Sequence, residues 1–438
     1  MKILHRTAVA TAIAASFVAS AHAQQQVVRP PIANYWMDVA THSMAGMEDM
    51  PGLSSLAIMG GGRGNAYGNT RGMSPGRWLD LALYTRNKPN GTDGSHAIPP
   101  GMRMGDSLPL VPMKPAPTPT REPGDVPEEY ERERPSGRIL IYWGCSETVR
   151  PGQPRILDLA TAAPVEFGRA LGGRHVPERG ARVAPGYSLW PNETSRTMVP
   201  REASLNGNHA VSGDGVPASL RFAIGQAQDF MPPIQLTASG ALTDSIALQW
   251  QPIATARAHY LHAMGTIGKD MVLWSSAEVP DTGMGLFDYL SNPTIDRWLQ
   301  DKLLLPAAQT QCAIPKGIFA GGRDSSGMLR MIAYGSELNL VHPPRPTDPR
   351  TPWEQEWTAR VRVKATTMSM LGSETGSRPR RPAAARAQEP ASTTEQDTPQ
   401  QATPQQEAPA ASTPSIPGLP GLPGAGRAVD AIRGIFGR

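Results

Sequence analysis

The chain has 438 residues, in which 42 lysines and arginines are set against 38 aspartates and glutamates, so the formal net charge is only +4. No basic block or stripe of interleaved aromatic residues accompanies this balance, which argues against a nucleic-acid partner. The 45 prolines and 44 glycines interrupt regular structure so often that long helices are disfavoured. The composition therefore favours a mainly β fold.

Residues 1–23 have the three parts of a secretory signal peptide. Lys2 and Arg6 supply the positive start, an apolar run follows, and Ala23 ends a small-residue motif at which we expect cleavage. The apolar run of about 14 residues is too short to span a bilayer. Cleavage after Ala23 removes two cations and no acid, so the net charge falls from +4 to +2. We therefore predict a periplasmic or secreted protein.

Residues 24–77 form a methionine- and glycine-rich segment that we expect to be irregular. Tyr35–Val39 is the one short strand predicted within it. The glycine-rich remainder is not expected to form regular structure, because glycine loses the most entropy on ordering. Met44, Met47 and Met50 are spaced by three, and their thioether sulfurs suit Cu(I). Methionine also commonly fills gaps in apolar cores, and that interpretation is the stronger one here.

Residues 78–372 are predicted to form a β-rich folded body. Ile246, Leu248 and Trp250 alternate with small or polar residues, which is the period of a strand with one face in a core. Residues 156–171 favour a short helix. Similar apolar runs predict further strands at 78–84, 138–143, 216–224, 271–274, 329–334, 338–341 and 357–370.

The strongest helix signal lies at 293–304. Asn292 is expected to cap this helix, and Pro293 suits its first position because it has no amide hydrogen to leave unpaired. The apolar positions share one stripe: Ile295, Trp298, Leu299 and Leu303.

Cys145 and Cys312 are the only cysteines in the chain. In an exported protein, a single disulfide between them is the favoured interpretation, and two buried free thiols are the alternative. Closing so long a loop would restrict the unfolded chain by roughly 5 kcal/mol on the entropic model.

Residues 217–283 resemble a fibronectin type III module. The resemblance depends on Leu248 and Trp250 in an early strand, on Pro252 after it, and on the approach to a second strand at Tyr260. It implies a β-sandwich, a fold used mainly for spacing and binding. The later strands depart from the usual tyrosine and leucine spacing of that family.

Candidate catalytic motifs are weak. The tripeptide Asp-Thr-Gly at 281–283 matches aspartic proteases, which need two copies, and this chain has one, so a turn is the better explanation. The motif around Ser188 lacks the final glycine of a nucleophile elbow. His259 and His262 lie three apart in a predicted strand and would point to opposite faces. We predict no catalytic residue, no cofactor and no metal site.

The composition changes after Gly372. Residues 373–415 are rich in proline, alanine and glutamine and cannot bury enough apolar surface to fold, so we expect a disordered linker. Residues 416–438 lead from a Pro/Gly stretch into a short amphipathic helix, which is marginal in isolation and needs a partner. An envelope protein or a membrane surface is the expected partner. The apolar side chains of this docking helix are Val429, Ile432, Ile435 and Phe436.

These features favour an exported cell-envelope protein that serves as a non-enzymatic binding or structural module. An exported hydrolase and a soft-metal carrier using Met44, Met47 and Met50 are the alternatives. A pocket of converging acids and imidazoles would favour the hydrolase, whereas Cu(I) affinity would favour the carrier.

Overall fold

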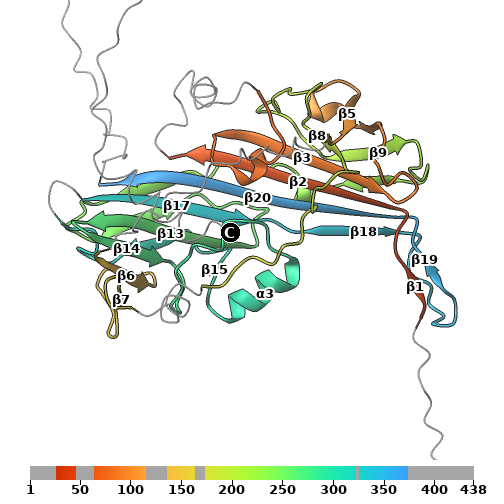
Figure 1. The fold of residues 1–438 in the computed structure, drawn as a ribbon. Coiled ribbons are helices and arrows are strands. Elements are labelled where there is room, and N and C mark those ends of the chain that lie inside the picture. The colour runs from red at the N-terminus through yellow and green to blue at the C-terminus, as the bar shows by residue number, and fades with distance from the viewer. Residues whose placement is uncertain (1–25, 46–63, 115–135, 163–172, 322–324, 373–438) are drawn as a thin grey trace, which may run out of the picture.

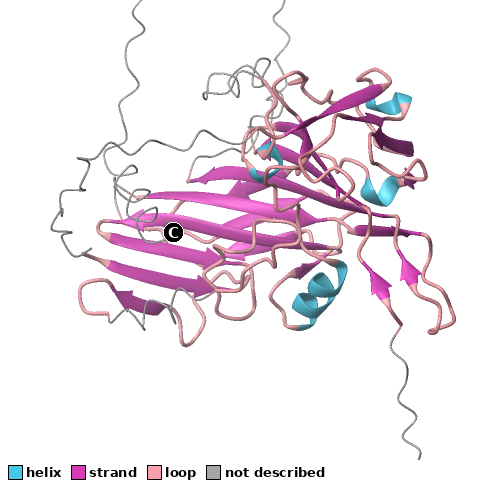
Figure 2. Ribbon diagram, turned by 45° about the vertical axis from the view of Figure 1, so that its right-hand side comes forward, coloured by secondary structure: helices cyan, strands magenta, loops and turns pink. Residues whose placement is uncertain are grey.

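The computed structural model describes residues 26–45, 64–114, 136–162, 173–321 and 325–372. Over these residues the protein is mainly β, as predicted, with a single α-helix, α3 (Asn292–Gln300). One large sheet runs through the molecule, and a smaller sheet packs against it (Figures 1 and 2). None of the helices in the described ranges is long and apolar enough to cross a membrane.

The large sheet contains fifteen strands among the described residues. Its main path is β10-β9-β4-β5-β8-β3-β2-β20-β17-β13-β14-β6-β7, with β15 beside β13 and β18 beside β20. The pairs β2–β20 and β14–β6 are parallel, and the other pairs are antiparallel. In chain order the strands are β2 (Ala33–Met44), β3 (Gly76–Thr85), β4 (Gly94–Ala97), β5 (Ser107–Pro112), β6 (Arg138–Trp143), β7 (Arg155–Asp158), β8 (Ser188–Trp190), β9 (Gly207–Gly213), β10 (Arg221–Ile224), β13 (Ala258–Ile267), β14 (Asp270–Ser275), β15 (Leu305–Pro306), β17 (Ser326–Tyr334), β18 (Leu338–His342) and β20 (Trp357–Leu371).

The centre of this sheet is formed by β2 and β20, so the expectation of an irregular segment was wrong for residues 33–44, where a strand of twelve residues replaces the short strand predicted at 35–39. All twelve residues of β2 pair with β20, ten of them also pair with β3, and both faces of the strand are covered. Tyr35 and Met37 face the apolar core, whereas Asp38 and His42 are buried on the opposite face. Polar residues on that second face obscure the hydrophobic pattern, because they are buried through polar contacts that the sequence does not reveal.

The smaller sheet has the order β11-β12-β16, with β11 (Leu236–Ser239), β12 (Ile246–Trp250) and β16 (Gln311–Ile314). Ile246 and Leu248 of β12 belong to the same core as Leu329 of β17 and Val363 of β20. The small sheet therefore packs on the apolar face of the large one. A separate two-stranded parallel pair is formed by β1 (Val28–Arg29) and β19 (Trp353–Glu354).

The strands of residues 217–283 divide between these two sheets. β11 and β12 lie in the small sheet, and β13 and β14 lie in the large one. A two-layer arrangement is therefore present in this region, and the fibronectin type III assignment itself stays a prediction.

The strands at the β10 end of the large sheet pack against the apolar face of its centre. Tyr35 of β2 contacts His96 of β4 and Phe222 of β10. Because the carbonyl of Leu205 can only accept, His209 donates to it from Nε2 at 2.7 Å and must accept at Nδ1 from His96, 2.9 Å away. His96 then accepts from the hydroxyl of Tyr35 at 2.8 Å. This chain of hydrogen bonds requires both imidazoles to be neutral, and burial favours that state because it lowers the pKa of each.

Helix α3 is present but differs at both ends from the predicted span 293–304. Ser291, rather than Asn292, is the N-cap, and its hydroxyl accepts from the amide of Thr294. The helix stops at Gln300, because Lys302 adopts a left-handed conformation with φ 56°. The predicted stripe still packs against the large sheet, where Ile295, Trp298 and Leu303 join one buried cluster.

The other predicted elements are mostly present. The strand at 138–143 has the predicted bounds, and the remaining strands differ at their ends. The helix expected at 156–171 begins instead as the edge strand β7. The signal peptide, Met47 and Met50, the linker 373–415 and the docking helix with Val429, Ile432, Ile435 and Phe436 lie outside the described residues.

Candidate functional site

The candidate site is a groove on the outward face of the small sheet. Burial alternates along β12, so Ile246, Leu248 and Trp250 face the core while Gln249 faces solvent. The antiparallel register sets Thr237 of β11 opposite Gln249. It sets Gln311 of β16 on the other side of Gln249. The three polar side chains therefore form one row across three strands.

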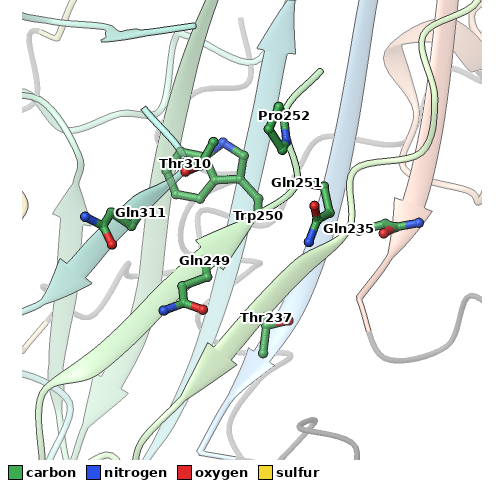
Figure 3. A pocket seen from close by; sticks show the side chains of 8 residues that line it. All are labelled: Gln235, Thr237, Gln249, Trp250, Gln251, Pro252, Thr310 and Gln311. Atoms are coloured by element: carbon green, nitrogen blue, oxygen red, sulfur yellow. The ribbon is translucent and has the colours of Figure 1, made fainter. Parts of the chain in front are cut away.

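A second tier of polar residues continues the first beyond the strand ends. The amide of Gln251 donates to the carbonyl of Gln235 at 3.4 Å, and the amide of Trp250 donates to the carbonyl of Thr310 at 3.0 Å. These backbone bonds extend the pairing of β11, β12 and β16 by one step. Figure 3 shows the side chains of the two tiers on neighbouring strands. They line a depression of about 480 Å³. Its lining residues are Gln235, Thr237, Gln249, Trp250, Gln251, Pro252, Thr310 and Gln311.

The lining of this glutamine-lined groove is polar but carries no charged side chain. Four primary amides and two hydroxyls supply both hydrogen-bond donors and acceptors. Within the described residues, none of the four glutamine side chains makes a hydrogen bond, so all four amides are available to a ligand. A cavity of this size is within the range that holds small molecules or a short stretch of chain.

The frame of the groove is held firmly. Cys145 and Cys312 form the predicted disulfide, and Cys312 directly follows the groove residue Gln311 on β16. The amide of Ser146 donates to the carbonyl of Ala313 at 3.1 Å, so the chain beside Cys145 also pairs with the outer edge of β16. Trp250 forms the core-facing side of the groove. Trp250 is 4% exposed, and its indole packs edge-on against His259, with ring centroids 5.6 Å apart.

A second polar cluster lies on the opposite face of the large sheet. Arg362 of β20 pairs with Asp38 of β2 through two hydrogen bonds, with Nε 2.7 Å from Oδ1. Lys364 lies 3.3 Å from the carboxylate of Asp288. The ring of Tyr289 lies 4.5 Å from the guanidinium carbon of Arg362 and 4.4 Å from the ammonium of Lys364.

Burial shifts the pKa values of the ionisable groups in this second cluster. Burial raises the pKa of Asp80 to about 7, with a smaller contribution from the nearby charge of Asp38 and an opposing one from the hydroxyl of Thr70. Burial also lowers the pKa of Lys364. The side chains of Arg362 and Lys364 are only 3% and 1% exposed. Since solvent does not reach them, we assign this cluster to structure rather than to ligand binding.

The two histidines of β13 point to opposite faces, as predicted. His259 faces Trp250, and burial lowers its pKa to about 4. His262 faces Phe287, and burial, followed by the charge of Arg330, lowers its pKa to about 3. His42 on β2 is buried beside Thr366, and its pKa is also lowered to about 3, chiefly by burial.

The motifs weighed as catalytic have structural partners. Asp281 accepts a hydrogen bond from the amide of Gly283 at 2.8 Å, which is the geometry of a turn, and a second from the amide of Arg174, distant in the sequence, at 2.9 Å. Ser188 is buried and donates to the carbonyl of Thr92. Met44, at the end of β2, is the one member of the methionine cluster in the described part of the chain.

The groove residues were missed by sequence reasoning. The strand period assigns Leu248 and Trp250 to the core. It assigns Gln249 to the solvent side of the strand, without indicating a role in binding. The sequence does carry a signal for part of the groove, because Gln249 and Gln251 alternate with core residues and so must share the outward face of the strand. The contribution of Gln235 and Gln311 depends on a strand register that one sequence does not give.

No family model matches the chain, and a search of the curated proteins finds no match. Across the described residues, no group of three or more His, Cys, Asp or Glu side chains is placed to hold a metal ion. The case for function therefore depends on the geometry of the groove.

Proposed function

We propose that the chain is an exported binding module that holds an uncharged, hydrogen-bonding ligand in the glutamine-lined groove. The observation that carries this proposal is the set of four amides, Gln235, Gln249, Gln251 and Gln311, which line one depression without partners among the described residues. Each primary amide offers two donors and an acceptor, so neighbouring hydroxyl or amide groups of a ligand are matched in pairs.

The lining favours binding over catalysis. Glutamine, threonine, tryptophan and proline side chains do not titrate near neutral pH, so the lining supplies no general base or acid. It also contains no ion to select a charged ligand. An oligosaccharide and an uncharged extended peptide are the two ligand classes that such a lining accommodates, and capture of each is insensitive to salt.

Export and anchoring complete the proposal. The disulfide between Cys145 and Cys312 is compatible with an oxidising compartment, as is the predicted signal peptide. We further propose that the linker 373–415 tethers the body to an envelope partner or membrane surface through the docking helix. Deletion of 416–438 should release the protein from envelope fractions, and unchanged fractionation would remove the tether from the proposal.

The groove is tested with arrays of neutral oligosaccharides and of uncharged peptides. Replacing Gln249 and Gln311 together by alanine removes two hydrogen-bonding groups at ~1 kcal/mol each, so capture should fall by tenfold or more. Gln226→Ala is the matched control, because Gln226 is an exposed glutamine outside the groove. Equal capture by the double variant and the wild type would refute a binding role for the groove.

A further inference from the structure

The chain continues beyond the described body from a point beside the β11–β12 loop, at the end of the small sheet that lies away from the groove. β20 ends at Leu371, and Gly372 follows with φ +81°. A Cβ placed on Gly372 would lie 2.8 Å from Cγ of Leu242, in the loop that joins β11 to β12. Residues 373–438 therefore begin against the same small sheet whose outward face carries the groove.

The sequence of that continuing chain contains a short repeat. Residues 398–401 and 403–406 both read Thr-Pro-Gln-Gln, so two copies follow each other within residues 398–407. We call residues 398–407 the repeat segment. It is uncharged up to Glu407, as the groove lining is.

We propose that the repeat segment binds the glutamine-lined groove of its own chain and competes there with an external ligand. This inference deepens the proposed function, because it names a proline-spaced peptide with two uncharged Thr-Pro-Gln-Gln units as the chemistry that the groove accepts.

The chemistry of the two partners is complementary. Proline favours an extended conformation with solvated carbonyl groups and carries no amide hydrogen, so the segment presents acceptors to the amide NH₂ donors of the groove. The glutamine side chains of the segment can pair with those of the groove, because each amide donates and accepts. An extended chain advances ~6 Å over two residues. The two tiers of the groove, also two residues apart along β12, are ~7 Å apart.

The linker is long enough to allow this contact. The groove lies about six residues from the β11–β12 loop along the strand, or ~20 Å. A flexible chain of 25 residues, the number from 373 to 397, has a root-mean-square span of ~25–30 Å. A tether of matching length gives an effective concentration of ~1 mM. A segment with a dissociation constant of ~0.1 mM would then occupy the groove about 90% of the time.

The first experiment places the photo-crosslinker benzoylphenylalanine at position 400 in place of Gln400 of the full chain. The expected product is a crosslink within one molecule to the peptide that contains Gln249, Gln251 and Pro252, identified by mass spectrometry. Crosslinks that join only two different chains would overturn binding within the chain. Crosslinks that avoid the small sheet would overturn the proposal altogether.

The second experiment deletes residues 398–407 and titrates the variant with a synthetic peptide of the same ten residues. We expect saturable binding that is insensitive to salt and weakened at least tenfold by Gln249→Ala with Gln311→Ala, whereas Gln226→Ala has no effect. A scrambled peptide of the same composition is the control. No preference for the repeat over the scrambled peptide would overturn the inference.

The two proposals fail in different ways. If the repeat segment occupies the groove, its deletion should strengthen capture of an array ligand by about tenfold, because the competitor is gone. Capture that depends on Gln249 and Gln311 but does not change on deletion would refute the inference and leave the proposed function standing. Peptide binding at the groove without capture of any external ligand would support binding of the repeat segment and refute the capture of an external ligand.

Discussion

Removal of one carboxylate from the centre of the large sheet should destabilise the protein more than any surface change. The change is Asp38→Asn, which preserves the shape of the side chain and removes its charge. Asp38 is the counterion of Arg362, and their side chains are 9% and 3% exposed. The variant therefore leaves a buried guanidinium with a neutral amide as its partner.

The magnitude follows from the burial of this pair. Breaking a buried ion pair by removing one partner costs roughly 3–5 kcal/mol, because the remaining charge is uncompensated. Asp80 lies opposite Asp38 on β3, and the charge of Asp38 helps to raise its pKa to about 7. Without that charge Asp80 ionises more readily and compensates Arg362 in part, so we expect a loss near ~3 kcal/mol. Adding Asp80→Asn should bring the loss toward ~5 kcal/mol.

The assay is urea unfolding of the full mature chain, followed by tryptophan fluorescence. The matched control is Glu193→Gln, which breaks the exposed pair between Lys114 and Glu193 and should cost less than ~1 kcal/mol. Replacing Asp38 by leucine and Arg362 by methionine together should recover most of the loss, because no charge is left buried. If Asp38→Asn cost no more than Glu193→Gln, the assignment of this cluster to structure would be wrong.

Three further predictions concern stability. Five buried histidines stay neutral in the fold, whereas the unfolded chain protonates them below the ordinary pKa of 6.5. The free energy of unfolding should therefore fall as pH drops from about 6.5 toward 4, by up to ~1.4 kcal/mol per histidine per pH unit, with Asp80 acting in the opposite direction. A urea midpoint that stayed constant over this range would contradict the neutral assignment. These histidines are His42, His96, His209, His259 and His262. Replacing Cys145 and Cys312 by serine should lower the free energy of unfolding by ~2–5 kcal/mol relative to the wild type, measured by the same titration. Ser291→Ala should cost ~1 kcal/mol, because it removes the cap of α3, and Ser291→Asp should restore most of it.

The sequence predicts the outward features of this fold better than its centre. The alternation at Ile246, Leu248 and Trp250 identifies β12, and the stripe at Ile295 and Trp298 identifies α3, because both elements bury one face and expose the other. The same pattern does not identify β2, because polar side chains of this strand are buried against partners more than 300 residues away, as Asp38 is against Arg362. Local pattern cannot report a contact of that range.

The same limit explains the groove. Its polar tiers are created by register between β11, β12 and β16, and register is a property of the assembled sheet. Because the four glutamine side chains make no hydrogen bond within the described residues, alanine at Gln249 or Gln311 should change the free energy of unfolding by no more than ~0.5 kcal/mol. The charged cluster stabilises the fold from the other side of the sheet, so binding and stability are separable in this protein. A groove variant that lost binding and also unfolded early would show that these amides belong to the structure and not to a ligand site.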